Sequence, residues 1–355
     1  MKNIYSGLYR FENLYKAYLC ARKNKRYRRE VLEYSYNLEE NLIQLQNELI
    51  WKIYKVGEYR EFYVYEPKKR LVMALPFKDR ILQWAIYNEL YPFYSKKFIT
   101  HTYACIKGRG THKAINQLQK WLRQLNRKWG KFYCLKMDIS KYFYRVDHDI
   151  LIKILKKNIK DRELIELLEI IIRDSQTEFG MEIDYSKEIR INNKGMPIGN
   201  LLSQLFANVY LNHLDQYVKR NLGEKYYMRY MDDFLILNHD KLHLHELKNK
   251  IEKFLENELK LNLNNKTSIK PVDLGIEFLG HKIWWSHIKL KKQSALRMKR
   301  RIRKRVKLYN DGMIEFEDLN STIQSYFGLM KNCDSYKLKE SIIKNIKLKR
   351  RNKNG

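Results

Sequence analysis

The sequence predicts an α/β protein of the α+β kind, and three segments support this prediction. FYCLKMD at 132–138 is apolar and aromatic enough for a buried strand, and it ends on a carboxylate. SQLFANVYLNHLDQYV at 203–218 carries apolar residues at helical spacing. YYMRYMDDFLIL at 226–237 indicates two short strands around a tight turn at Met231 and Asp232. Strand, helix and hairpin would together form one compact unit.

Further helices and more than one subdomain are expected. Asn37 and Glu40 resemble a capping box, and the four leucines that follow share one helical stripe, Leu38, Leu42, Leu45 and Leu49. A chain of 355 residues with 44% apolar residues can build the cores of two or three subdomains. Since the chain has five prolines and no Gly/Ser-rich linker, we expect these subdomains to interlock.

The charge of the chain indicates a polyanionic partner. Lys and Arg number 71 against 40 Asp and Glu, which gives a net charge of +31. An AT-rich genome would explain the lysines, but it encodes Glu as readily, so it does not explain the imbalance. Basic residues form three runs, at 22–29, at 291–307 with ten Lys or Arg and no acid, and at 347–353. Such a run is often only a solvated face, but three of them favour contact with phosphates.

Several other classes of protein are not supported. The four cysteines are scattered without a CxxC pair, which indicates neither a disulfide framework nor a zinc site. There is no N-terminal apolar core of a signal peptide, and no run of 18 apolar residues. We therefore expect a protein of the reducing cytoplasm.

Three carboxylates are candidates for metal-dependent phosphoryl transfer. That chemistry uses two divalent cations about 3.5–4 Å apart, and magnesium prefers oxygen ligands. Asp138 at a strand end and Asp232 with Asp233 in a hairpin turn could supply them. An Asp-Asp pair alone is equally typical of a surface turn. Here, however, apolar strand residues flank the pair, where unpaired carboxylates would be costly.

Several motifs resemble those of reverse transcriptases, in the same order along the chain. Those similar to the palm are LKMDISKYF (135–143), GMPIGNLLSQLFANVYL (195–211), YMDD (230–233), LNLNNKTSI (261–269) and GIEFLGHKI (275–283). Those similar to the fingers are PKKRLVMALPFKDRILQ (67–83) and TYACIKGRGTHKAI (102–115). The resemblance covers most of the chain.

Within that superfamily the chain resembles the reverse transcriptases of diversity-generating retroelements. Ile198-Gly199-Asn200 through Ser203-Gln204 is similar to the IGNxxSQ of that group, where most retroelement enzymes have QGxxxSP. Four further segments look like sequences of the group, at 36–46, 63–71, 103–112 and 333–339. Enzymes of group II introns and of abortive-infection systems share the palm, so they remain alternatives.

The resemblance implies a right-hand polymerase with fingers, a palm built on an antiparallel sheet, and a helical thumb. The implied subdomains are a basic helical N-terminal extension (1–59), fingers (60–130), a first part of the palm (131–149), a fingers insertion (150–194), a second part of the palm (195–285) and a basic helical thumb (286–355).

The resemblance also implies roles for single residues. Two magnesium ions, for which Mn²⁺ could substitute, would be held by Asp138, the main-chain carbonyl of Ile139, Asp232 and Asp233. Phe143 is similar to the steric gate that crowds a ribose 2′-hydroxyl, and an ordinary core Phe is its alternative. Lys266 resembles the lysine that protonates departing pyrophosphate, although a solvated lysine would look the same.

Other implied positions contact the nucleotide, the primer and the duplex. Those near the incoming nucleotide are Lys69, Arg70, Arg109, Phe143, Ile198, Gly199 and Gln204. Those of the primer grip are Phe278, Leu279 and Gly280. Those of the thumb that would bind nucleic acid are Arg297, Arg300, Arg301, Arg303 and Lys304.

The expected function is RNA-directed synthesis of DNA, with mutation at template adenines, for a diversity-generating retroelement. Expected partners are a template RNA and its hybrid with DNA, deoxynucleoside triphosphates, and a small basic helical accessory variability protein that forms a ring-shaped oligomer. A reverse transcriptase of an intron or a defence system is the first alternative. A non-catalytic RNA-binding protein on a polymerase scaffold is the second, and the intact set of three aspartates speaks against it.

Overall fold

The chain folds into two compact units. The computed structural model describes residues 3–65, 70–174, 178–181 and 190–349. The first unit comprises Met1–Lys107, Lys136–Leu235 and Glu246–Thr267, and the second comprises Gly108–Leu135, Ile236–His245 and Ser268–Gly355. The chain passes from one unit to the other within β3 (Tyr133–Asp138), β7 (Asp233–Asn238) and α11 (Lys241–Leu259). Two further crossings, between Lys107 and Gly108 and between Thr267 and Ser268, lie outside the helices and strands or at the start of β8.

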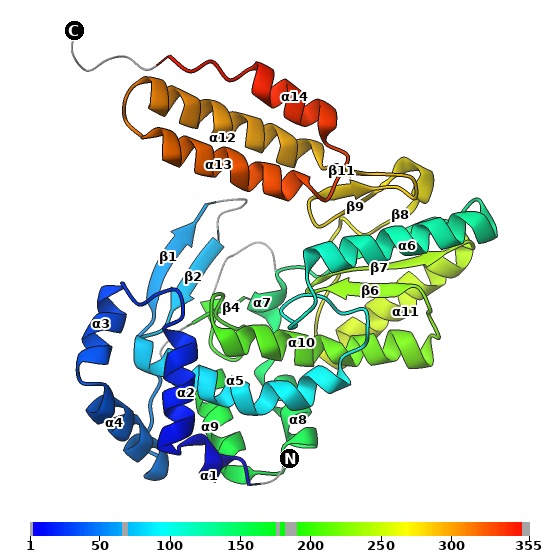
Figure 1. Cartoon of the computed structure of the whole chain (residues 1–355). Helices are drawn as coiled ribbons and strands as arrows, with labels where there is room; N and C mark the ends of the chain where they lie inside the picture. The colour runs from blue at the N-terminus through cyan, green and yellow to red at the C-terminus, as the bar shows by residue number, and fades with distance from the viewer. Residues whose placement is uncertain (1–2, 66–69, 175–177, 182–189, 350–355) are drawn as a thin grey trace. The chain divides into compact units, whose positions relative to one another are not determined.

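The first unit is mainly helical and carries the hairpin of the YMDD motif (Figure 1). Its further elements are α1 (Tyr5–Leu8), α2 (Phe11–Ala21), α3 (Arg29–Tyr36), α4 (Leu38–Ile50), β1 (Arg60–Val64), β2 (Arg70–Ala74), α5 (Phe77–Lys97), α7 (Tyr142–Arg145), α8 (His148–Asn158), α9 (Arg162–Ile172), β4 (Gly180–Met181), β5 (Arg190–Ile191), α10 (Leu201–Gln216), the π-helix η1 (Tyr217–Asn221) and β6 (Tyr227–Tyr230).

The core of the first unit lies around α5 and α10. Both α2 and α10 pack against α5, which buries Ile81, Leu82 and Ile86 completely. Helix α10 buries residues on every side of its axis, as an interior helix does. Hence a helix predicted from apolar spacing alone lies in the centre of this unit.

The structure confirms the three segments on which the fold prediction depends, and it corrects one detail. The predicted strand is β3, the predicted helix is α10, and the predicted hairpin is β6 and β7 joined at Met231 and Asp232. Helix α4 buries Leu42, Leu45 and Leu49. The capping box is wrong, because Asn37 has φ −110° and ψ 51° and its side chain makes no cap hydrogen bond.

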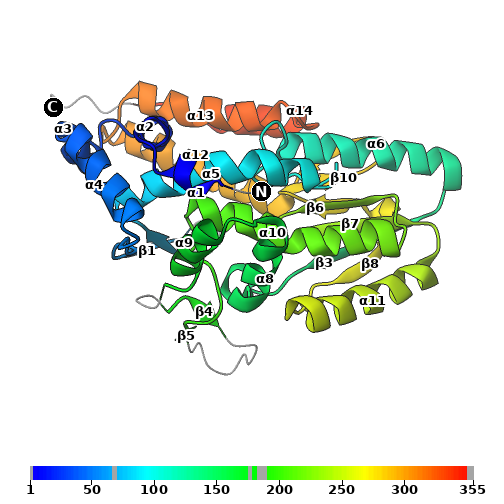
Figure 2. The same ribbon diagram turned by 90° about the horizontal axis from the view of Figure 1, so that it is seen from below.

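The second unit combines a small antiparallel sheet with long helices. Its further elements are α6 (Thr111–Trp129), β8 (Ser268–Pro271), the 3₁₀ helix η2 (Val272–Leu274), β9 (Ile276–Phe278), β10 (His281–Ile283), β11 (Ile288–Leu290), α12 (Lys292–Asn310), α13 (Phe316–Met330) and α14 (Tyr336–Lys344). The small sheet has the order β11-β10-β9, and α6 packs against β10 (Figure 2).

The C-terminal helices of the second unit have a core of their own. Helices α12 and α13 lie side by side in both views (Figures 1 and 2). Met298, Ile302, Met330 and Ile342 form their buried cluster. Among the described residues, no helix is both long enough and apolar enough to cross a membrane.

A four-stranded sheet brings the strands of the three aspartates together. Its order is β6-β7-β3-β8, so β3, which ends at Asp138, lies beside β7, which begins at Asp233. The backbone N–H of Ile139 donates to the carbonyl of Asp232 over 3.2 Å, which joins the end of β3 to the hairpin turn.

A fully buried ion pair between Arg229 and Asp215 supports the hairpin of β6 and β7. Arg229 on β6 donates from Nε to Asp215 Oδ1 over 2.8 Å and from Nη2 to Oδ2 over 2.6 Å. Neither side chain is exposed. Tyr227 and Thr102 donate their hydroxyls to the same carboxylate over 2.7 and 3.0 Å, so its charge is well compensated.

The same guanidinium reaches the turn between β6 and β7. Arg229 Nη1 donates to the carbonyl of Met231 over 3.0 Å and to Asn208 Oδ1 over 3.1 Å. Met231 has φ +57°, a left-handed conformation that is unusual for a residue with a side chain. The buried pair therefore holds the backbone of the turn in a conformation that the chain rarely adopts unaided.

Loss of this pair should destabilise the protein strongly. Arg229→Met leaves the Asp215 carboxylate buried without its cation, and we expect the free energy of unfolding to fall by about 3–5 kcal/mol in urea titrations. The double variant Arg229→Met/Asp215→Leu should recover part of this loss, because no unpaired charge remains. The control is Arg173→Met, whose ion pair with Asp149 is exposed and should contribute less than about 1 kcal/mol. Equal losses in Arg229→Met and Arg173→Met would contradict the role of the buried pair.

Candidate functional site

Asp138 is held at the end of β3 by a loop that follows α11. The side-chain amide of Asn264 donates to Asp138 Oδ2 over 3.1 Å, and its backbone N–H donates to the Asp138 carbonyl over 2.7 Å. The Asn264 side-chain oxygen in turn accepts the backbone N–H of Lys266 over 3.1 Å. Asn264 therefore links the loop of the exposed Lys266 to Asp138.

Asp233 has a cationic partner on β3. Lys136 Nζ lies 3.3 Å from Asp233 Oδ2. Lys136 and Asp138 share one face of the strand, because side chains alternate along it. The other carboxylate oxygen of Asp233, Oδ1, is buried and has no hydrogen-bond partner.

The electrostatics of the turn disfavour bare carboxylates. Burial raises the pKa of Asp232 to about 6, and the negative charge of Asp138 adds to this rise. Burial likewise raises the pKa of Asp233 to about 6, although Lys136 opposes the change. Carboxylates that are partly desolvated and crowded by like charge are stabilised by a cation.

These residues fit a divalent cation in part. Asp138 and Asp232 are hard oxygen ligands whose charges interact, and the orphaned Oδ1 of Asp233 is a further acceptor. The three do not form a ready cage, however. Within the described part of the chain, no group of three or more His, Cys, Asp or Glu side chains is arranged to hold a metal ion.

The predicted triphosphate contacts differ in their placement. Arg70, at the start of β2 and exposed, lies close enough for its charge to lower the pKa of Asp232 against the effect of burial. Arg109 precedes α6 in the second unit. Lys69 lies outside the described residues. The structure therefore brings Arg70, of these three, into the field of the aspartates.

Phe143 and Ile198 share an apolar environment. Both are partly buried and pack against the cluster of Leu71, Met73 and Phe179. The Ile198 carbonyl accepts the backbone N–H of Met73 over 3.2 Å, which ties this segment to β2. The predicted gate and the predicted apolar nucleotide contact thus belong to one cluster.

Gly199 fixes the backbone next to Ile198. It has φ +115°, where residues with a side chain are strained, and an added Cβ would lie 3.0 Å from Val72 Cγ1. Asn200 then donates its amide to the Tyr59 hydroxyl over 3.1 Å. Gln204 is partly buried in the first turn of α10. The segment is therefore anchored on both sides of Ile198.

The predicted primer grip forms a tight hairpin in the second unit. Phe278 and His281 pair across the turn between β9 and β10. Leu279 and Gly280 form this turn with φ +49° and +79°, as a two-residue hairpin requires. Phe278 itself is buried, so its direct contribution is to the core beneath the turn.

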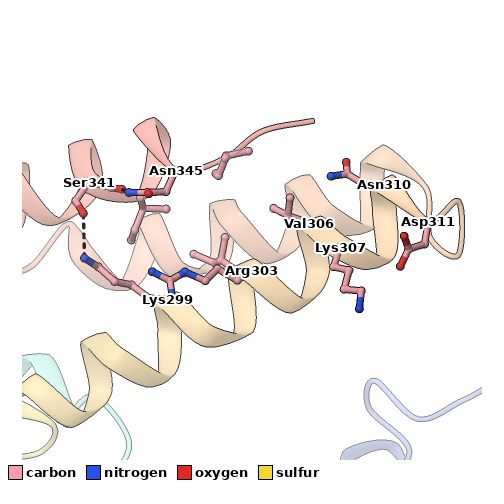
Figure 3. Close-up of a pocket in the computed structure, with 11 residues that line it drawn as sticks. Lys299, Arg303, Val306, Lys307, Asn310, Asp311, Ser341 and Asn345 are labelled. Atoms are coloured by element: carbon pink, nitrogen blue, oxygen red, sulfur yellow. Dashed lines mark hydrogen bonds between the residues drawn. The ribbon is translucent and has the colours of Figure 1, made fainter. Parts of the chain in front are cut away.

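The five predicted cations of the thumb are all exposed on α12, namely Arg297, Arg300, Arg301, Arg303 and Lys304. Figure 3 shows Lys299, Arg303 and Lys307 beside a groove between α12 and α14, whose volume is about 280 Å³. Lys299 Nζ donates to Ser341 Oγ over 3.0 Å across this groove. Of the five, Arg303 is the one that lines the groove.

Sequence reasoning missed Lys136, Asn264 and Arg229. Lys136 could have been found, since residues two apart on a strand share one face. Asn264 stands within the quoted LNLNNKTSI segment, where only Lys266 was singled out. Arg229 gave no such signal, because its partner Asp215 is on a different element.

Comparison with known proteins identifies the family. Residues 63–283 match the model of the reverse transcriptase (RNA-dependent DNA polymerase) family. Protein YkfC of Escherichia coli K12 is 28% identical over 274 residues, which cover 67% of this chain and 70% of YkfC. The group II intron-encoded protein LtrA of Lactococcus lactis is 27% identical over 152 residues, which cover 42% of this chain and 23% of LtrA.

The fold is also similar to that of a solved reverse transcriptase. The apo telomerase of Candida tropicalis superimposes with a TM-score of 0.50 at 13% identity, over 81% of this chain and 62% of the telomerase chain. The chain thus spans less than two thirds of that protein and less than a quarter of LtrA. Because the family model covers most of the chain, including the strands and turn of the three aspartates, the protein belongs to the reverse transcriptases, the RNA-directed DNA polymerases, and group II intron-encoded proteins are among its relatives.

Proposed function

We propose that this reverse transcriptase copies a template RNA into cDNA that is mutated at adenines, as part of a diversity-generating retroelement. One observation carries the finer part of the proposal. An apolar residue, Ile198, stands where most retroelement enzymes have glutamine, and it packs with Phe143 against an apolar cluster. The site next to the incoming nucleotide would therefore lack a polar constraint on base pairing.

Asp138 and Asp232 would be the direct ligands of magnesium, or of Mn²⁺ in its place, together with the main-chain carbonyl of Ile139. The bound cations would supply charge neutralisation of the triphosphate and activation of the primer hydroxyl. Asp233, whose Oδ2 lies 3.3 Å from Lys136 Nζ, would stand beside the direct ligands. Arg229 and Asn264 are positioning residues, because they hold the Met231 carbonyl and the Asp138 carboxylate.

The remaining predicted contacts complete the substrate site. Arg70 and, in the full complex, Lys69 and Arg109 would bind the triphosphate, since guanidinium forks match phosphate oxygens. Phe143 would exclude the ribose 2′-hydroxyl. Lys266 would protonate pyrophosphate, and its loop reaches Asp138 through Asn264. Gly199 and Gln204, which belong to the segment of Ile198, would also contact the nucleotide.

The hairpin Phe278-Leu279-Gly280 would support the primer end, and α12 would follow the duplex backbone. We also propose the division into fingers, palm and thumb at the bounds predicted from the sequence. The partners would be the template RNA, its hybrid with DNA and an accessory variability protein, in the cytoplasm of a bacterial or phage-infected cell.

A second candidate function is that of a group II intron-like or defence enzyme, which the similarity to LtrA favours. The DNA that flanks the gene discriminates between the two. Two near-identical repeats that differ at template adenines, beside a small basic reading frame, would support the diversity-generating retroelement. Their absence would favour the intron or defence function.

The first activity test concerns the metal ligands. Asp232→Asn should lower the rate of primer extension on an RNA template by at least about a thousandfold, because each catalytic cation contributes several kcal/mol to the transition state. RNA binding should persist. Asp273→Asn, an exposed aspartate outside the site, is the matched control and should extend primers normally. Extension by Asp232→Asn near the wild-type rate would exclude the proposed site.

The second test concerns the thumb. Replacement of Arg300, Arg301 and Arg303 by Gln should weaken binding to an RNA–DNA hybrid. It should also flatten the log–log salt dependence by about 0.7–0.9 for each phosphate that the thumb no longer neutralises. Sequence preference should stay the same. A salt slope equal to that of the wild type would mean that this face of α12 is only solvated.

The third test concerns accuracy at adenine. Ile198→Gln adds a polar side chain, and one neutral hydrogen bond of about 1 kcal/mol can change discrimination several-fold. We expect fewer errors opposite adenine, with synthesis retained. Sequencing of cDNA made by both enzymes on one RNA measures the effect, and Ile198→Val controls for a change of volume. Equal adenine error frequencies would remove Ile198 as the determinant, and a wild-type enzyme without elevated adenine errors, even with its accessory protein, would argue against the retroelement.

A further inference from the structure

Helix α6 carries positive charge without any compensating acid. Its 19 residues include Lys113, Lys120, Arg123, Arg127 and Lys128, and neither Asp nor Glu. Helix α11 has the same length with four lysines and four glutamates, which is typical of a solvated helix. Arg127 and Lys128 in the last turn favour the helix dipole, but Lys120 and Arg123 lie too far from the end for that explanation.

The two faces of α6 differ sharply. The inner face buries apolar side chains, Ala114, Ile115, Leu118, Trp121, Leu122 and Leu125. The outer face forms a hollow of about 460 Å³ that is lined by polar and cationic side chains, Asn116, Gln119, Lys120, Arg123, Gln124 and Arg127. From Asn116 to Arg127 this outer stripe, which we call the α6 stripe, is roughly 16 Å long at 1.5 Å per residue.

One contact joins the α6 stripe to the main chain of a residue whose aromatic side chain is exposed. Arg123 Nε donates to the carbonyl of Trp285 over 3.0 Å, in the turn between β10 and β11. This bond uses one of the five N–H donors of the guanidinium and orients the group. The neighbouring indole of Trp284 already stacks on the ring of His287, with ring centroids 4.4 Å apart. Trp285 is 42% exposed.

We propose that the α6 stripe and Trp285 form a binding surface for single-stranded RNA, additional to the thumb. The cations and amides would contact consecutive phosphates, and the indole would stack on a base, which is how proteins bind single strands without sequence preference. The stripe offers three cations along one helix face, Lys120, Arg123 and Arg127, so it can contact more than one phosphate. An acidic protein segment would use the cations but would leave the amides and the indole without a role.

The test measures binding and requires no DNA synthesis, so it does not depend on the proposed retroelement function. The probe is a fluorescein-labelled 20-nucleotide uridine RNA, and the full chain is used. Replacement of Lys120, Arg123 and Arg127 by Gln should weaken binding and lower the log–log salt slope by about 2, at roughly 0.7 for each phosphate of a single strand that is no longer neutralised. The control replaces Lys241, Lys250 and Lys253 of α11 by Gln, which removes the same charge from exposed positions.

A second variant tests the aromatic part of the surface. Trp285→Ala should weaken binding of the single strand about fivefold or more, because it removes the indole that stacks on a base, and it should leave the salt slope unchanged. Binding of a blunt-ended RNA duplex, in which every base is paired, should not respond to Trp285→Ala. Circular dichroism and thermal unfolding establish that each variant is folded.

Three results would overturn the proposal. The first is an equal loss of affinity in the α6 and α11 variants, which would reduce the effect to net charge. The second is a Trp285→Ala variant that binds the uridine RNA like the wild type, or that loses affinity for the blunt-ended duplex equally. The third is a triple variant that keeps its RNA affinity but no longer binds a polyglutamate peptide, which would assign the surface to an acidic protein.

Discussion

The buried pair of Arg229 and Asp215 is the interaction on which the arrangement of the turn between β6 and β7 depends. It joins β6, α10 and the carbonyl of Met231 through one guanidinium, and further hydroxyl and amide groups complete its hydrogen bonding. Ion pairs without access to water are costly unless every donor and acceptor is satisfied. The pair of Arg229 and Asp215 supports a turn that holds a left-handed residue, Met231, and two adjacent carboxylates.

The site concentrates negative charge in a protein that is strongly positive. A net charge of +31 attracts nucleic acid from every side, whereas Asp138, Asp232 and Asp233 repel phosphates at the place where the chemistry would occur. The raised pKa values of Asp232 and Asp233 reflect the electrostatic cost of that arrangement. Selectivity for the reacting phosphates would therefore arise locally, while affinity for the polymer would come from basic surfaces such as α12 and the α6 stripe.

The sequence predicted those parts that depend on local patterns. The strand before Asp138, helix α10 and the hairpin at Met231 and Asp232 were readable, because apolar periodicity and the paired aspartates specify them. The contacts of Arg229 and Asn264 were not, since each depends on a partner that only the folded chain brings near. The capping box failed because Asn37 satisfied the pattern without the geometry. The cationic stripe of α6 was overlooked because its residues are interrupted in sequence and adjacent only on a helix.

Gly199 restricts substitution at its own position but not at the neighbouring position 198. Its φ of +115° would strain a residue with a side chain, and an added Cβ would lie 3.0 Å from Val72 Cγ1, so this position favours glycine whichever residue stands at 198. A single substitution at position 198 would therefore leave the backbone conformation of Gly199 unchanged. If Ile198 controls accuracy as proposed, the error rate of the enzyme would depend on this one side chain, and selection could raise or lower it by replacing that residue.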